Sequence, residues 1–250
     1  MDYLERTYRE LHRQQDLIHF QVAVKETDLD IGVRKDRYSP SMVDWVVELI
    51  KAGREPLEDY IARDPQFLKA LSPHPLLPYA PPLAQAMSQA AALAGVGPMA
   101  AVAGAMAEWV GKALSKRSRD VIVENGGDIY IRTSRTRNVG IFAGESPLSN
   151  QLALEIRPDQ SPLGICTSSG RVGPSLSFGQ ADAVVIISPS APLADAVATA
   201  AGNLVRKRDD VEKAVRLAST IPGITGAVVI MDDQLAAWGQ IKLQPTAPLF

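Results

Sequence analysis

Three short segments in the second half of the chain combine small residues with oxygen ligands or backbone amides. They are Glu-Asn-Gly-Gly-Asp at 124–128, Gly-Ile-Cys-Thr-Ser-Ser-Gly at 164–170 and Ala-Asp-Ala-Val-Ala-Thr at 194–199. Hydroxyls and turn amides bind phosphate groups well, and carboxylate and hydroxyl oxygens suit Mg²⁺. Together the segments indicate a phosphate-bearing ligand held with a divalent cation.

The first segment is also a good β-hairpin. Asn-Gly between apolar runs supplies the positive φ angles of a two-residue loop, and taken alone the plain hairpin is the preferred interpretation. In the functional interpretation, Asn125, Gly126 and Gly127 let the backbone approach a ligand, so that the glycine amides face an anion. Asp128 would then accept a hydrogen bond from a ring or a ribose.

In the second segment an apolar strand leads into three hydroxyls and a glycine. Thr167, Ser168, Ser169 and Gly170 can hold a phosphate, although Ser/Thr turns of this kind are common. Cys166, the only cysteine, is interpreted first as a small buried residue at the end of a strand and second as a reactive thiol.

The third segment places a carboxylate and a hydroxyl on one helix face. Asp195 and Thr199 are four residues apart, so their oxygens lie one above the other and form part of a shell for Mg²⁺. The alternative is structural, because Asp195 follows Pro192 in the first turn, where an acid gains about 0.3–1 kcal/mol from the helix dipole. The spacing alone leaves the two interpretations equal.

Composition narrows the class of protein. The chain has 250 residues, 46% hydrophobic and 22% charged, with a net charge of −2. The one compact basic cluster, Arg206 to Arg208, is followed directly by two aspartates and is interpreted as a junction between helices, so a nucleic acid partner is not expected. A single cysteine excludes an internal disulfide and gives no indication of an oxidising compartment.

Two features bear on location. The first six residues are charged and lack an apolar core, so no signal peptide is expected. Residues 81–107 carry no charge, but they are rich in Ala and Gly and are interrupted by Gly95-Val96-Gly97-Pro98. Two buried helices joined by a tight turn are preferred to a membrane span. A cytoplasmic protein is therefore expected.

The elements that would position the three segments can be read from periodicity. Residues 17–33 alternate around a polar turn and predict an antiparallel strand pair. Glu26, Asp28 and Asp30 recur at every second residue there, and a solvated turn or face is preferred to a metal site. Ser39-Pro40 opens a helix that Gly53 and Pro56 are expected to split, and five prolines at 72–82 predict an extended connection.

The rest of the chain predicts a helix pair followed mainly by strands. Helices are expected at 83–94 and 98–116. The second has so little side-chain bulk on one side, at Ala103, Gly104, Ala107 and Gly111, that it should lie close to a sheet or another backbone. The remaining strands and helices, about nine and five in the whole chain, have mostly hairpin-length connections. This pattern favours an α+β fold with helices on a largely antiparallel sheet, forming one domain over 1–250 with an N-terminal part at 1–82.

In this order, the segments resemble the ApbE-like superfamily, a T-fold-related group that includes magnesium-dependent FAD:protein FMN transferases. The match over 83–243 comprises Gly104-Ala105-Met106-Ala107, the Asn-Gly-Gly-Asp turn, the Thr167–Gly170 turn, and Ala194-Asp195-Ala196 with Thr199. The chain is most similar to a compact bacterial and archaeal branch of unassigned function. That branch shares the runs Val-Gly-Pro-Met-Ala-Ala-Val-Ala-Gly-Ala, Val-Glu-Asn-Gly-Gly-Asp and Gly-Ile-Cys-Thr-Ser-Ser-Gly.

The resemblance implies an ApbE-like fold, a flavin or nucleotide such as FAD as ligand, and Mg²⁺ at Asp195 and Thr199. The glycine turn and the residues 167–170 would contact the cofactor. Two departures stand beside it: Glu108 replaces the lysine of the transferases' Gly-Ala-x-Ala-Lys-Gly pattern, and residues 171–182 contain no histidine. No catalytic residue is assigned.

Three hypotheses of different classes follow. The first is an Mg²⁺-dependent enzyme that cleaves or transfers at the pyrophosphate of FAD or a related nucleotide. The second is a flavin- or nucleotide-binding protein without catalysis, and the third is a sulfur-handling protein that uses Cys166. A homodimer is expected because twofold dimers are the commonest assemblies.

Overall fold

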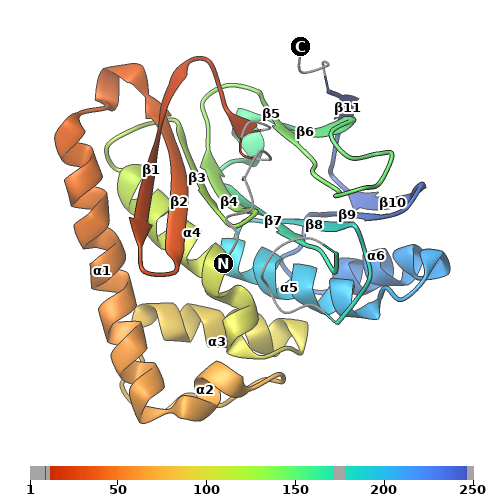
Figure 1. Ribbon diagram of the computed structural model, residues 1–250, viewed down its shortest axis with the longest axis horizontal. Helices are drawn as coiled ribbons and strands as arrows, with labels where there is room; N and C mark the ends of the chain where they lie inside the picture. The colour runs from red at the N-terminus through yellow and green to blue at the C-terminus, as the bar shows by residue number, and fades with distance from the viewer. Residues whose placement is uncertain (1–8, 10–11, 172–177, 247–250) are drawn as a thin grey trace.

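The chain folds into two antiparallel sheets with helices against one of them, in a computed structural model that describes residues 9, 12–171 and 178–246 (Figure 1). The larger sheet has the order β1-β2-β3-β4-β7-β8-β9-β10 and the smaller one β11-β6-β5. All strand pairs are antiparallel. The predicted α+β class is confirmed.

The eight strands of the larger sheet come mostly from neighbouring hairpins. Two strands of the small sheet, β5 and β6, are inserted between β4 and β7, and its third strand, β11, follows β10. The larger sheet consists of β1 (Leu17–Val24), β2 (Thr27–Arg34), β3 (Val121–Asn125), β4 (Asp128–Arg132), β7 (Leu163–Ser168), β8 (Ala183–Ser188), β9 (Gly226–Met231) and β10 (Gln234–Gly239). The smaller sheet consists of β5 (Arg137–Gly140), β6 (Leu152–Ile156) and β11 (Leu243–Pro245). The strand pair predicted at 17–33 is confirmed, with its turn at Lys25 and Glu26.

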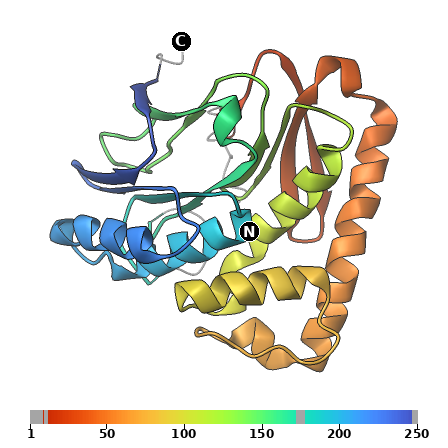
Figure 2. The same ribbon diagram turned by 180° about the vertical axis from the view of Figure 1, so that it is seen from behind.

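The helices lie against one face of the larger sheet and the small sheet lies against the other, as both ribbon views show (Figures 1 and 2). The α-helices are α1 (Pro40–Arg63), α2 (Pro65–Lys69), α3 (Pro82–Ala94), α4 (Val102–Leu114), α5 (Ala191–Leu204) and α6 (Val211–Thr220). Short 3-10 turns stand at Lys35–Arg37, Pro98–Ala101, Pro158–Gln160 and Arg208–Asp210. One hydrophobic core joins the helices to the sheet, and a second fills the space between the two sheets.

The prediction that Gly53 and Pro56 split the first helix is wrong. α1 continues from Pro40 to Arg63 with Pro56 inside it. Its buried positions recur every three or four residues on one side, so continued burial offsets the lost hydrogen bond. Gly53 is enclosed by the side chains of Trp109 and Leu83, which would have to shift for a Cβ there.

The uncharged stretch forms two helices, as predicted. No single helix among the described residues is long and apolar enough to cross a membrane, and α3 and the segment Pro98–Leu114 meet at 104°. Gly95 makes the turn with a φ of 73° and caps α3. A Cβ on Gly97 would overlap the Ala70 carbonyl, so the second glycine of the turn is required by a close backbone approach.

The low bulk of α4 allows two close approaches, as predicted. At Gly104 the helix meets the backbone of Ala191, the first residue of α5, and at Gly111 it meets the ring of Tyr130 in β4. α4 therefore crosses the sheet at β3 and β4 and contacts α5 directly. This crossing brings the first and third segments together.

The carboxylates of the first hairpin do not share a solvated face. Asp30 is fully buried, where its carboxylate accepts a hydrogen bond from His19 Nδ1 at 2.8 Å and lies 3.7 Å from His12 Nε2. The two histidines hold the pKa of Asp30 well below its ordinary value of 3.8, although burial alone would raise it. The preference for a solvated face is thus wrong for Asp30, while Glu26 pairs with Arg54 at the exposed turn.

Candidate functional site

The Asn-Gly-Gly-Asp segment is a two-residue hairpin between β3 and β4. Asn125 pairs with Asp128, and Gly126 and Gly127 form the loop with φ angles of 66° and 103°. Positive φ at both loop positions is what the right-handed strand twist requires, and glycine adopts it without strain. The hairpin interpretation is confirmed, and the functional one now depends on what the turn contacts.

The turn is anchored on both sides by hydrogen bonds. Asn125 donates through its side-chain amide to the Ala103 carbonyl, 3.1 Å away, just before Gly104 in α4. The Gly127 amide donates to Glu124 Oε1 at 2.8 Å, and Glu124 Oε2 accepts from Arg9 Nε at 2.8 Å. The Gly127 amide is therefore directed toward a protein carboxylate.

Asp128 begins β4 at the foot of this turn and is buried. Its Oδ1 accepts a hydrogen bond from the Thr167 amide in β7 at 3.2 Å, which joins the first and second segments. Burial and the nearby Asp195 carboxylate raise the pKa of Asp128 well above its ordinary value. Both effects favour the protonated form of Asp128.

The Asp195 side chain is bound by a backbone amide in the first turn of α4. Its Oδ2 accepts a hydrogen bond from the Gly104 amide at 2.9 Å. Burial raises the pKa of Asp195 to about 7, although the Gly104 and Ala103 amides oppose this shift. Thr199 lies one turn later on α5 and is half-buried, as the predicted four-residue spacing requires.

A second hydrogen bond joins α4 and α5, and here α5 supplies the amide and α4 the carboxylate. Glu108, one turn after Gly104 in α4, accepts a hydrogen bond on Oε2 from the Ala191 amide at 2.7 Å and also pairs with Lys112. Ala191 stands one turn before Asp195 in α5. Each helix thus offers one amide and one carboxylate to the other, so the glutamate at 108 helps to fix the position of Asp195.

The predicted residues after Thr167 have other contacts. Ser168 is buried with its hydroxyl toward Gly202 in the last turn of α5. Ser169 Oγ donates to the Ala181 carbonyl at 3.4 Å and accepts from the Arg171 amide at 3.1 Å, and the Gly170 amide donates to the Ala181 carbonyl at 2.9 Å. The amides of Gly127, Thr167 and Gly170 all donate within the protein, and a phosphate would have to compete for them.

Cys166 is a buried neighbour of the acids. Its Sγ donates to the Ala191 carbonyl at 3.3 Å, and its exposed fraction is 0%. Burial and the carboxylates of Asp128, Asp195 and Glu108 raise the pKa of the thiol well above its ordinary value. A reactive thiol needs the opposite environment, so these contacts favour a structural role.

The cluster as a whole is acidic. Four carboxylates, those of Glu108, Glu124, Asp128 and Asp195, lie in it, and the described ion pairs assign Arg9 to Glu124 and Lys112 to Glu108. No group of three or more Asp, Glu, His or Cys side chains among the described residues could hold a metal by itself. Mg²⁺ needs fewer protein ligands, because one or two carboxylates with water and substrate phosphates suffice. The carboxylate and hydroxyl of Asp195 and Thr199 fit that requirement.

Sequence reasoning missed several residues of this cluster. Glu124 is a charged residue in an apolar strand, which was a signal, but nothing local indicated its partner Arg9, 115 positions away. Gly104 was noted for its lack of bulk and not for its amide. The role of Glu108 as an acceptor for α5 had no sequence signal at all.

Comparisons with known proteins agree with this architecture. A family model described as "AbpE bacteria" matches residues 9–237. Similar relatives are a UPF0280 protein of Methanosarcina acetivorans, 41% identical over 89% of this chain and 86% of its own, and one of Methanothrix thermoacetophila, 44% identical over 78% and 84%.

Solved structures of low identity share the fold. The apo form of the flavinyl transferase ApbE from Pseudomonas stutzeri superposes with a TM-score of 0.56 at 16% identity, covering 92% of this chain and 94% of its own. The ApbE protein of Thermotoga maritima gives 0.53 at 14% identity, covering 88% and 96%. The family model matches most of the chain, and the two relatives are more than 40% identical to it. The chain therefore belongs to the ApbE-like superfamily.

Proposed function

We propose that this chain binds FAD or a related flavin or adenine nucleotide together with Mg²⁺ at Asp195 and Thr199, and cleaves or transfers at its pyrophosphate. The fold is shared with flavin transferases of the ApbE type. The observation that carries the proposal is the convergence of Asp128, Asp195 and the glycine turn through hydrogen bonds that join β3 to α4, α4 to α5, and β4 to β7.

The charge of the cluster supports a cation-dependent site. A pyrophosphate would meet the carboxylates of Asp128 and Asp195. Burial raises the pKa of both acids, and the Asp195 charge raises that of Asp128 further. A divalent cation removes that repulsion and lets both carboxylates ionise. We therefore expect that FAD does not bind measurably when no divalent cation is present.

Each residue of the proposed site would have its own role in binding the cation or the nucleotide. Asp195 and Thr199 would hold the cation, which supplies charge neutralisation as the phosphoanhydride bond breaks. Gly126, at the exposed tip of the turn, lets the ligand approach the backbone, and Asp128 would hydrogen-bond a ring or a ribose. Six further residues support the proposed site and would contact the cofactor only at their accessible atoms. They are Asn125, Gly127, Thr167, Ser168, Ser169 and Gly170.

The test is titration of FAD, FMN and ADP with and without Mg²⁺ by calorimetry, together with detection of released AMP by chromatography. Asp195→Asn and Thr199→Val keep the size of each side chain, and we expect each to weaken Mg²⁺-dependent binding about 10- to 100-fold. Asp44→Asn and Thr220→Val, both at exposed helix positions, are matched controls that should bind normally.

The outcomes separate the hypotheses. AMP release that requires Mg²⁺ supports the enzyme. Saturable binding without AMP supports the second hypothesis, a flavin- or nucleotide-binding protein without catalysis. Failure of every ligand to bind would remove both. A cytoplasmic location and a homodimeric state are further parts of the proposal.

A further inference from the structure

β10 is an open edge of the larger sheet. Its inner side pairs with β9, and no strand among the described residues pairs with its outer side. The strand Gln234–Gly239 contains no charged residue and no proline, and it exposes Leu235 (36%) and Trp238 (39%). Natural edge strands are usually protected by lysine, proline or a covering element. An edge strand without charge or proline is typical of a strand that pairs with another chain.

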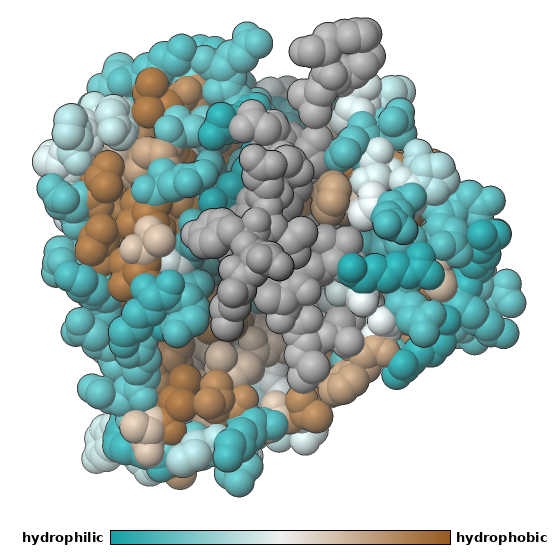
Figure 3. Space-filling view, viewed as in Figure 1, coloured by the Kyte–Doolittle hydropathy of each residue, from teal (hydrophilic) through white to brown (hydrophobic). Residues whose placement is uncertain are grey.

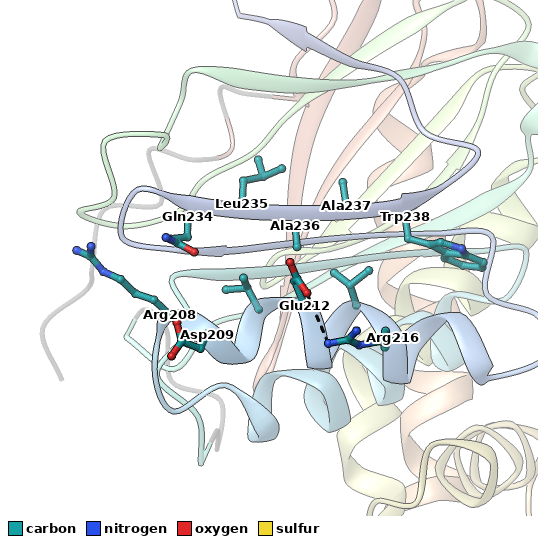
Figure 4. A pocket seen from close by; sticks show the side chains of 11 residues that line it. Arg208, Asp209, Glu212, Arg216, Gln234, Leu235, Ala236, Ala237 and Trp238 are labelled. Atoms are coloured by element: carbon teal, nitrogen blue, oxygen red, sulfur yellow. Dashed lines mark ion pairs between the residues drawn. The ribbon is translucent and has the colours of Figure 1, made fainter.

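A groove runs along this edge between β10 and α6. It has a volume of about 660 Å³, and its lining includes α6 residues of both charge signs (Figure 4). Arg208 and Asp209 lie at the Gln234 end of β10, and Arg216 lies below Ala237 and Trp238 at the other end (Figure 4). Arg208 pairs with Asp232 and Asp233 within the same copy, which leaves Asp209 as the outward-facing charge at this end. Seen over the whole molecule, this end is a mostly hydrophilic surface with few apolar residues (Figure 3).

We propose that this edge is the interface with a second copy of the chain, formed by antiparallel pairing of the two β10 strands about a twofold axis at Ala236. In that register Leu235 lies opposite Ala237 of the second copy, and Trp238 lies opposite Gln234. Each large side chain thus faces a smaller or polar one. Paired positions differ by an even number, so both copies of α6 lie on the same face of a continuous sheet.

The charges at the ends of the groove are complementary under the same axis. Asp209 of one copy comes to the end that carries Arg216 of the other, and the contact occurs twice by symmetry. Within one copy, Asp209 pairs with Lys207 at 3.6 Å and Arg216 with Glu212 at 3.5 Å, and all four side chains are at least two-thirds exposed. Such loose exposed pairs contribute little, so their charges can pair across an interface at small cost.

A second copy fits this edge better than a peptide does. A peptide of one predominant charge would be attracted at one end of the groove and repelled at the other, whereas an inverted copy matches both ends. The groove is lined by eleven residues per copy, fewer than the roughly 20–30 a side of a standard interface. The expected dimer is therefore weak and dissociates on dilution.

The test is sedimentation velocity and light scattering of the full chain over a wide range of concentrations. The wild type should show a monomer–dimer equilibrium. Leu235→Lys with Ala237→Lys, both at exposed positions, would place like charges opposite each other in the paired strands. We expect this variant to be monomeric throughout, with circular dichroism and a melting curve like those of the wild type.

A charge exchange makes the test specific for the register. Arg216→Glu should raise the dimer dissociation constant roughly 10-fold, because like charges would meet twice. Adding Asp209→Arg should restore it. Lys51→Glu, on the exposed side of α1 beside Glu48, is the control and should leave association unchanged.

Three results would overturn the proposal: a wild type that stays monomeric at all concentrations, a dimer that the lysine variant does not dissociate, or an Arg216→Glu defect that Asp209→Arg does not repair. A wild type that stays monomeric would mean that β10 does not pair with a second copy of the chain. The second would place the dimer contact on a different face.

Discussion

Replacing Gly104 by alanine tests the helix crossing on which the site depends. A Cβ at this position would lie 2.5 Å from the Ala191 carbonyl oxygen and 2.9 Å from Asp195 Cβ. The first neighbour is backbone at the start of α5, so it cannot rotate away as a side chain would. Gly104→Ala must therefore push α5 away from α4 and lengthen the Gly104–Asp195 hydrogen bond.

The size of the effect follows from two opposing contributions. Overpacking a dense interior costs about 1–3 kcal/mol, and a clash with backbone belongs at the upper end. Alanine in a helix gains about 1 kcal/mol over glycine. The expected net loss is about 2 kcal/mol in the free energy of unfolding, or roughly 4–8 °C in Tm for a chain of this length.

Gly202→Ala is the matched control, since Gly202 is also a helical glycine in the same layer. The nearest atom to its Cβ would be Ser168 Oγ at 3.4 Å, which is ordinary contact. This variant should gain up to about 1 kcal/mol from helix propensity. Urea unfolding of both variants should thus differ by about 3 kcal/mol, and equal stabilities would refute the close crossing.

Three further predictions concern the buried polar groups. Glu108→Ala leaves the Ala191 amide without its acceptor and should cost about 1–3 kcal/mol in urea unfolding, whereas Glu108→Gln keeps an acceptor and should cost less; equal losses would contradict the role of the acceptor. Because His12 and His19 lower the pKa of Asp30, its contribution to stability is present above its ordinary value of 3.8 and is lost as the pH falls toward its folded value. Unfolding measured from pH 5 down to pH 2 should show less loss of stability in Asp30→Asn than in the wild type, and parallel curves would count against the cluster. Cys166→Ala removes a buried thiol with a raised pKa, so it should leave FAD binding and AMP release unchanged, and loss of either with the fold intact would revive the sulfur hypothesis.

Local patterns were enough to predict most of the elements. The hairpin at 124–128 was predictable because two adjacent glycines allow the positive φ angles of its loop. The close approach of α4 was predictable from missing side-chain bulk at Gly104 and Gly111. The break predicted at Pro56 was wrong, because a proline in the sequence does not show how much burial of the other residues stabilises the helix around it.

The electrostatic partners could not be predicted, because they depend on contacts between distant parts of the chain. Asp30 looks like one acid of a polar turn until His12 and His19 are placed beside it. The glycine turn looked open to an anion, yet the Gly127 amide donates to Glu124, which in turn needs Arg9. The burial of each carboxylate and the identity of its partner are set by the folded sheet, so residue spacing in the sequence cannot predict them.

The position of Glu108 gives the departure from the transferase pattern a physical meaning. A lysine there would bring a positive charge to the start of α5, where the amide of Ala191 needs an acceptor, and the carboxylate supplies that acceptor. The same change adds a negative charge to a cluster that already contains Asp128 and Asp195. Glu108 therefore supports the helix crossing where the transferases have a cationic contact, and we expect a polyphosphate bound there to need an added cation. Dependence on a divalent cation should accordingly be stronger in this chain than in Glu108→Lys, when FAD binding is compared with and without Mg²⁺.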